Sequence, residues 1–194
     1  MINKFLILTT GIVLSLFNGN LISQTTLDYK DRVHPQISEK FMVVSQNYHA
    51  TEVGYKILEK GGNAVDAAVA MGFALAVTLP RAGNLGGGGF MLLFDAKTKK
   101  ISTLDYRSAA PKSAKSTMYL TEDGVVRYGH LVNAVPGTVA GLIKAHNAHG
   151  KLSLKQVMRP SIELAHKGIS VSNDLNFILN WGKESLFQNK TIVN

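Results

Sequence analysis

The sequence contains no cysteine, and its positive charge is scattered rather than clustered. Without thiols, the 194-residue chain can form no disulfide, thiolate metal site, cysteine nucleophile or lipidated cysteine. The formal net charge is +8, but Lys and Arg form no continuous stripe, and aromatic residues make up only 8% of the chain. Proteins that bind nucleic acid usually combine a basic surface with aromatic platforms. We therefore expect no nucleic-acid partner.

Metal-ligand clusters and membrane-length apolar runs are lacking as well. His146 and His149 have helical spacing but no further ligands nearby, so we expect helix-surface histidines and no metal site. An uncharged apolar run, 5–17, follows Lys4 and is shorter than the ~20 residues of a membrane span. This pattern predicts a signal peptide over 1–23 and a periplasmic or secreted body with no membrane association beyond export. An uncleaved N-terminal anchor is the alternative.

The strongest structural signal is a helix over residues 64–78 that has almost no polar face. Asn63 can cap its first amides, and Asp66 stands where a capping box needs an acceptor. A helix that is apolar on every side must be covered all round by protein. Hydrophobic residues amount to 45% and charged residues to 18%, as in globular proteins. A core of helices and sheet is therefore expected around this helix.

The segments around this helix alternate between strand and helix signals. We predict a short buried strand at 41–45, a helix at 51–60, a buried strand at 88–94 that forms a hairpin with 101–106, mostly loop at 107–130, and helices at 138–149, 154–158, 162–166 and about 175–181. Pro160 separates two of these helices. No linker interrupts the pattern, so 41–194 is expected to be one layered α/β unit after a polar lead-in at 24–40.

Gly83 and the run 86–89 do not form a phosphate-binding loop. A Walker loop ends in Lys and Ser or Thr, whereas this run is followed by Phe90 and Met91. A dinucleotide fingerprint needs a strand before the glycines and a helix after them, which is the reverse of the order here. The glycines instead indicate close backbone approach, either to the apolar helix or to a ligand.

Four ordered motifs resemble the start of the large subunit of gamma-glutamyltransferases, also called glutathione hydrolases. These are GGNAVDAAVA at 61–70, AGNLGGGGF at 82–90, LDYR at 104–107 with Ala-Pro at 110–111, and VPGTVAG at 135–141. The similarity runs from about residue 41 to about residue 171. It implies an α/β (α+β) fold, a partial αββα N-terminal-nucleophile hydrolase sandwich that comprises a large-subunit portion only.

The resemblance also implies an activity. Precursors of this family cleave themselves, and the threonine that begins the small subunit attacks the γ-glutamyl carbonyl of glutathione or a γ-glutamyl peptide. Water or an acceptor amino acid or peptide then resolves the threonyl acyl-enzyme, without a metal or organic cofactor. No segment of this chain matches the nucleophile, so we expect no catalytic residue in it. We expect 41–194 to be a truncated N-terminal portion, inactive without the small subunit and the rest of the precursor.

Arg107 is the substrate-binding residue that the resemblance implies, and its partner is the α-carboxylate of the γ-glutamyl group. A planar guanidinium can hold a carboxylate through two parallel hydrogen bonds. From the residues alone, a surface arginine at a strand end is the alternative. Asp105 is expected to brace the strand end. Ser108 departs from the acidic residue of many members, and Arg81 is unusual after its proline, where it either competes for an anionic ligand or faces solvent.

Two other functions remain open. The first is a non-catalytic periplasmic fragment that binds γ-glutamyl compounds or a partner chain. The second is an amidohydrolase of the same superfamily with another substrate, such as a cephalosporin acylase.

Overall fold

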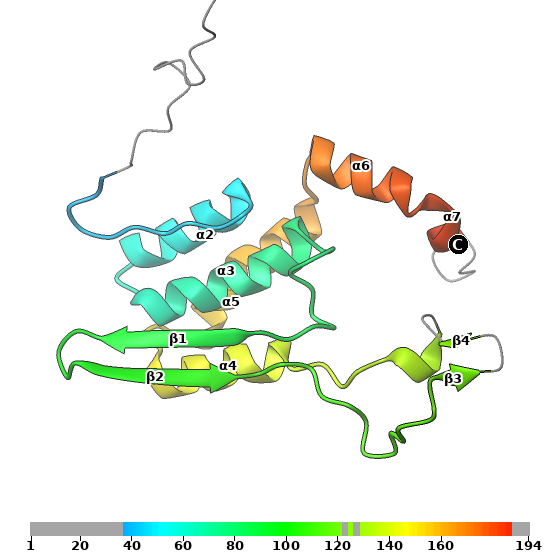
Figure 1. Ribbon diagram of the computed structural model, residues 1–194. Coiled ribbons are helices and arrows are strands. Elements are labelled where there is room, and N and C mark those ends of the chain that lie inside the picture. Colours follow the sequence, from blue (N-terminus) through cyan, green and yellow to red (C-terminus); the bar gives the residue numbers. More distant parts are fainter. Residues whose placement is uncertain (1–36, 122–123, 126–128, 188–194) are drawn as a thin grey trace, which may run out of the picture. The chain divides into compact units, whose positions relative to one another are not determined.

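The computed structural model describes residues 37–121, 124–125 and 129–187 (Figure 1). The chain divides into two compact units, Met1–Glu39 and Lys40–Asn194, and the fold described below is that of the second. The predicted signal peptide at 1–23 lies outside the described residues, as does most of the lead-in at 24–40. No helix within the described ranges is long and apolar enough to cross a membrane.

The second unit is a group of helices packed against one face of a β-hairpin. Its elements are α2 (Tyr48–Glu59), α3 (Ala64–Thr78), β1 (Phe90–Asp95), β2 (Lys100–Asp105), β3 (Leu120–Thr121), β4 (Gly124–Val125), the 3₁₀ turn η2 (His130–Val132), α4 (Thr138–His149), α5 (Leu154–Lys167), α6 (Asn173–Trp181) and α7 (Lys183–Phe187). Strands β1 and β2 are antiparallel, and so are β3 and β4.

Helix α3 is the centre of the fold and has the bounds that the sequence predicted. The predicted capping box is present: Asn63 Oδ1 accepts the Asp66 N–H at 2.9 Å, and Asp66 Oδ2 accepts the Asn63 N–H at 2.9 Å. Helices α2, α4 and α5 all contact α3 (Figure 1). Only Ala64 on this helix is exposed, which confirms that an apolar helix without a polar face is enclosed by the fold.

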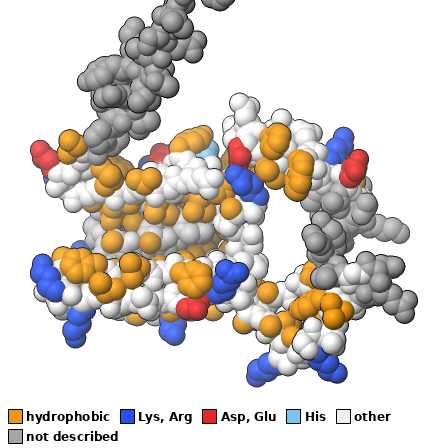
Figure 2. Space-filling view, viewed as in Figure 1, with side chains coloured by type: hydrophobic (Ala, Val, Ile, Leu, Met, Phe, Trp, Pro, Cys, Tyr) orange, Lys and Arg blue, Asp and Glu red, His pale blue; other side chains and the backbone are white. Residues whose placement is uncertain are grey.

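The β1–β2 hairpin is confirmed, but the prediction that its first strand is buried is wrong. The inward side chains contact the core around α3; they are Met91, Leu93 and Leu104. The outward apolar side chains of β1 are 58–73% exposed; they are Phe90, Leu92 and Phe94. Figure 2 shows hydrophobic side chains on this surface. The strand is half-buried because the helices in the described part of the chain pack on one face of the hairpin only.

Residues 41–45 do not form the predicted strand. Their side chains alternate between half-buried and exposed, as in an extended chain. No β-ladder within the described ranges includes them. The Phe41 ring instead packs on Tyr55 of α2, with ring centroids 5.3 Å apart. Period-2 hydrophobicity predicts an extended backbone, whereas a strand also needs a partner that supplies hydrogen bonds.

The two short helices predicted at 154–158 and 162–166 are one helix, α5, with Pro160 inside it. A proline removes one helical hydrogen bond, and it usually ends or kinks a helix. Here packing on α3 holds both sides of the proline. Val157 is fully buried, and the Ser161 hydroxyl donates to the Ala70 carbonyl of α3 at 3.2 Å. Gly168, with φ of 75°, ends the helix as predicted.

The other helix predictions are largely confirmed. Helix α2 begins earlier than the predicted 51–60 because Asn47 caps it, accepting the N–H groups of His49 and Ala50. Helix α4 has the predicted range, and α6 contains the predicted 175–181. Helix α7 was not predicted, and the predicted loop 107–130 contains β3 and β4.

Candidate functional site

The segment that carries Arg107 is fixed on both sides by backbone hydrogen bonds. Tyr106 N–H donates to the Gly89 carbonyl at 3.0 Å, and Gly89 N–H donates to the Tyr106 carbonyl at 3.3 Å, which extends the hairpin by one pair. Ala109 and Val135 exchange a second pair of hydrogen bonds, at 3.0 and 2.8 Å. The backbone of Arg107 is therefore held between two short ladders.

The start of helix α4 joins the same corner. The N–H groups of Gly137 and Thr138 both donate to the Gly87 carbonyl, at 2.8 and 3.2 Å. The Thr138 hydroxyl donates to the Asn84 carbonyl at 3.2 Å. Together with the Gly89–Tyr106 pair, these bonds connect the motifs at 82–90, 104–107 and 135–141, which are distant in the sequence, into one site.

The glycines of this corner allow close approach to other protein segments. A Cβ atom on Gly83 would lie 2.8 Å from the Leu75 Cβ and 3.2 Å from its carbonyl carbon, so the chain here packs on α3. A Cβ atom on Gly88 would lie 2.6 Å from the Tyr106 carbonyl oxygen and 2.8 Å from the Arg107 carbonyl carbon. The sequence predicted close approach either to the apolar helix or to a ligand. Gly83 does approach the apolar helix, whereas Gly88 approaches the segment that carries Arg107.

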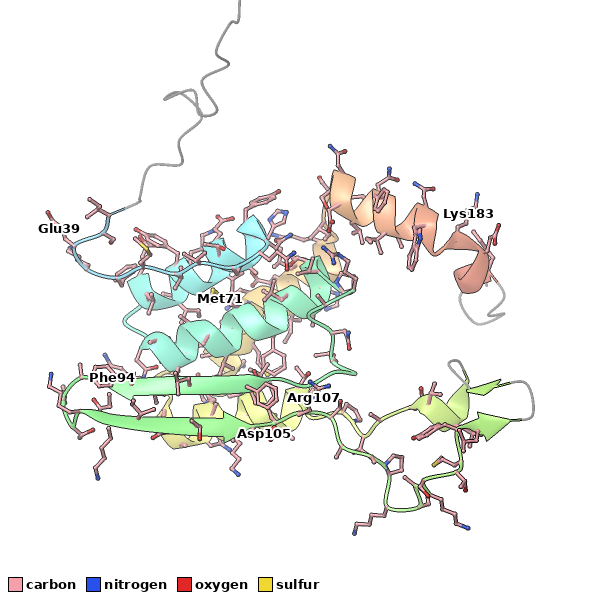
Figure 3. All side chains as sticks on the ribbon, in the orientation of Figure 1. Glu39, Met71, Phe94, Asp105, Arg107 and Lys183 are labelled. Atoms are coloured by element: carbon pink, nitrogen blue, oxygen red, sulfur yellow. The ribbon has the colours of Figure 1, made fainter. Side chains whose placement is uncertain are left out.

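Arg107 is exposed and lines a cavity of about 100 Å³ together with Gly88, Gly89, Phe90 and Ser108. Figure 3 shows Arg107 at the end of the hairpin that lies away from Phe94 and the turn. No acidic residue within the described ranges forms an ion pair with its guanidinium. The head group is thus accessible beside the glycine corner and has no carboxylate partner from the described part of the protein.

Asp105 braces the end of β2, as predicted. Its Oδ1 accepts the backbone N–H of Arg107 at 2.9 Å. The bond closes a tight turn of the chain directly before the arginine, so the carboxylate fixes the backbone rather than neutralising the guanidinium.

Arg81 is exposed, which agrees with the second of its two predicted roles, and it also has a partner that the sequence did not reveal. Its Nε and Nη2 donate to Oδ2 and Oδ1 of Asp174, at 3.1 and 3.2 Å, in a bidentate pair. Its side chain is 33% exposed. The guanidinium therefore joins α6 to the corner after α3, and its charge is compensated within the chain.

The prediction that His146 lies on the helix surface is wrong, whereas His149 is exposed. His146 is buried, with Nε2 2.9 Å from the Leu152 carbonyl oxygen and 3.6 Å from Oδ1 of Asp66. This contact belongs to the core between α3, α4 and α5. Across the described ranges, no group of three or more His, Cys, Asp or Glu side chains could hold a metal ion.

Tyr106 is the site residue that sequence reasoning missed. Its ring is half-buried between the glycine corner and α4, and burial raises the pKa of its phenol above the ordinary value. The sequence contained one signal for this packing, the glycine at 141 within a helix, because a helical glycine usually has a packing reason.

Comparison with known proteins places these motifs in one family. The sequence model of gamma-glutamyltranspeptidase matches residues 50–193. The glutathione hydrolase proenzyme of Escherichia coli K12 is 44% identical over 151 residues, which is 75% of this chain and 26% of that protein. The corresponding Pseudomonas aeruginosa proenzyme is 47% identical over 154 residues, 77% of this chain and 27% of that protein. The chain thus spans about a quarter of the length of these relatives.

Solved structures give the same answer for the fold. The crystal structure of Helicobacter pylori gamma-glutamyltranspeptidase superposes with a TM-score of 0.78 at 38% sequence identity, covering 82% of this chain and 47% of that one. This likeness confirms the fold class predicted from the sequence, a partial N-terminal-nucleophile hydrolase sandwich.

Proposed function

The chain belongs to the gamma-glutamyltranspeptidase family, and we propose that it supplies the part of such an enzyme that holds the γ-glutamyl substrate. In this proposal Arg107 binds the α-carboxylate of the γ-glutamyl group of glutathione or a γ-glutamyl peptide. A threonine outside this chain, at the start of the small subunit, attacks the γ-carbonyl carbon and forms the acyl-enzyme. Water or an acceptor amine then takes the γ-glutamyl group.

The accessible guanidinium of Arg107, held beside the glycine corner, is the observation that supports this proposal. The other arginines that the structure describes, Arg81 and Arg159, are paired with Asp174 and Glu163. An arginine that lacks an internal partner but has a fixed backbone is suited to hold a planar carboxylate through two hydrogen bonds. Gly88 and Gly89 line the same cavity, so on that side a bound carboxylate would meet backbone rather than side chains.

The proposal includes no cofactor and no catalytic residue in this chain. Acyl transfer to a threonine oxygen needs a base that takes the hydroxyl proton and donors that stabilise the oxyanion. We assign both to the small subunit and the remainder of the precursor, which we propose as the partner of this chain. We also propose export to the periplasm or the medium, based on the signal-peptide pattern at 1–23.

The test compares γ-glutamyl donor kinetics of the enzyme formed by this chain and its completing polypeptide. Arg107→Ala should raise KM for the donor by about 10- to 100-fold, because two hydrogen bonds to a charged group are lost. Arg107→Lys should lie between Ala and wild type, since an ammonium gives only a point charge. Arg159→Ala is the matched control, because it removes an exposed arginine from an i,i+4 pair on α5.

The alternatives give different outcomes in the same test. A donor KM that Arg107→Ala leaves unchanged contradicts the carboxylate assignment. Hydrolysis of an acyl β-lactam side chain in preference to γ-glutamyl donors would indicate the acylase alternative. Calorimetric binding of glutathione by the chain, with no turnover after any complementation, would indicate a non-catalytic binding protein.

A further inference from the structure

We propose that Tyr106 is a positioning residue for Arg107 and that Gly89, Gly137 and Gly141 form the slot that holds it. This inference rests on the proposed function, since it concerns how the carboxylate-binding guanidinium is kept in place. Tyr106 precedes Arg107 directly in the chain, so any displacement of its backbone is passed on to the arginine.

The three glycines contact different parts of Tyr106. A Cβ atom on Gly89 would lie 2.9 Å from Cε2, Cζ and Oη at the outer end of the ring. A Cβ atom on Gly141 would collide with Cβ and Cγ at the root of the ring and lie 2.6 Å from Cδ2. A Cβ atom on Gly137 would collide with the carbonyl oxygen and lie 2.8 Å from the carbonyl carbon. Ring and backbone of Tyr106 are therefore both enclosed.

Backbone conformation does not explain these glycines. The described glycines with positive φ are Gly61, Gly124, Gly129 and Gly168, so the three slot glycines have φ values that other residues adopt. Gly141 lies inside helix α4, where glycine is less favourable than alanine. Space for Tyr106 is the remaining reason for a glycine at that position.

The slot glycines affect Arg107 through the backbone hydrogen bonds that hold Tyr106. Gly89 is hydrogen-bonded to Tyr106 in both directions, and the Gly137 N–H donates to Gly87 two residues before Gly89. A side chain at position 141 would push the Tyr106 ring outward and strain this ladder. Misplacement of a binding group by about 1 Å can cost a factor of ~100 in activity.

The test uses two alanine substitutions at helical glycines. Gly141→Ala removes the space for Tyr106, whereas the control Gly54→Ala in α2 would bring a Cβ atom 2.6 Å from Cγ and Sδ of Met71, away from α4 and Tyr106. In the completed enzyme, Gly141→Ala should raise KM for the γ-glutamyl donor by about tenfold or more, with a smaller change in kcat. Gly54→Ala should leave KM unchanged, even if urea unfolding shows an equal loss of stability. Equal KM values for the two variants would overturn the inference.

Two further variants separate a positioning role from general packing. Tyr106→Leu should raise KM as Gly141→Ala does, whereas Tyr106→Phe keeps the ring in the slot and should recover most of that loss. In Gly141→Ala the phenol should also titrate closer to its ordinary pKa, because the displaced ring is less buried. A Tyr106→Leu enzyme with wild-type KM would contradict the positioning role.

Arg107→Ala distinguishes failure of the inference from failure of the proposed function. If Arg107→Ala raises KM and Gly141→Ala does not, the positioning role alone is wrong. If Arg107→Ala has no effect on KM, the carboxylate assignment fails, and the positioning role fails with it.

Discussion

Asp66 is the buried side chain whose removal should destabilise the fold most clearly. It is fully buried at the start of α3. Its carboxylate accepts the backbone N–H groups of Asn63 at 2.9 Å, Lys151 at 3.0 and 3.1 Å, and Leu152 at 3.2 Å. It therefore joins the first turn of α3 to the connection between α4 and α5. His146 lies 3.6 Å from the same carboxylate.

Asp66→Ala leaves three N–H donors without their acceptor. Hydrogen bonds to a charged group contribute about 1.5–3 kcal/mol each. Lys151 is exposed and Leu152 is half-buried, so water will replace part of what is lost. We therefore expect a loss of about 3–5 kcal/mol, which is less than the sum of three such bonds. For a domain of this size, such a loss lowers Tm by roughly 10 °C.

Thermal and urea unfolding followed by circular dichroism measure this effect. The matched control is Asp95→Ala, because Asp95 also accepts a backbone N–H, that of Lys97 at 2.9 Å, but lies exposed in the hairpin turn. Asp66→Asn should fall between wild type and Asp66→Ala, since the amide keeps one acceptor oxygen. Equal unfolding midpoints for Asp66→Ala and Asp95→Ala would refute this account of the α3 start.

Two further measurements follow from the contacts around the site. Burial raises the pKa of Tyr106, so ultraviolet titration should place it above the ordinary value of about 10. As pH rises, the Tyr106 phenol therefore loses its proton in the unfolded chain before it does so in the folded chain. The free energy of unfolding should fall as pH rises from about 10 through the pKa of the folded state. A Tyr106→Phe variant with the same dependence of stability on pH would contradict this. Arg81→Gln should increase amide hydrogen exchange in α6 a few-fold, because the partly exposed pair with Asp174 contributes about 1 kcal/mol or less and α6 has no buried residue. Reversing both charges should restore protection; unchanged exchange in Arg81→Gln would show that other contacts hold α6.

Local signals in the sequence were sufficient for α3 and its surroundings. The bounds of α3 follow from a capping box at one end and Pro80 after the other, with apolar residues between. The hairpin and α4 follow from similar local signals, namely polar turn residues and a glycine after the last helical turn. Each of these signals lies within a few residues of the structure that it determines.

The partner of Arg81 was missed, and the predictions for 154–166 and His146 were wrong, because each depended on contacts between distant residues. Arg81 and Asp174 are 93 positions apart, so no pattern around Arg81 could reveal its partner. Helix α5 continues through Pro160 because Ser161 bonds to Ala70, 91 positions away. His146 is buried because Asp66 and the α4–α5 connection surround it. Helix propensity and the spacing of hydrophobic residues contain no information on such pairs. Where tertiary packing favours another structure, it overrides the local propensity.

In the candidate site, too, local features were predictable and long-range contacts were not. Its motifs were recognisable from the sequence, and so was the brace from Asp105 to Arg107, which spans only two positions. The slot around Tyr106 was not, because its walls come from β1 and α4. Only the folded chain places Gly141 against the ring.

The outward apolar face of β1 has a consequence for how the hairpin finds its register. Both faces of this strand are hydrophobic, so a slip of one residue would exchange one apolar face for the other at little cost in burial. The turn must therefore select the pairing. Asp95 accepts the Lys97 N–H and the Thr98 hydroxyl there, and Lys99 adopts a left-handed conformation with φ of 57°. A pairing shifted by one residue would bring Phe90, Leu92 and Phe94 to the core and expose Met91 and Leu93, so the turn determines which apolar face of β1 is buried.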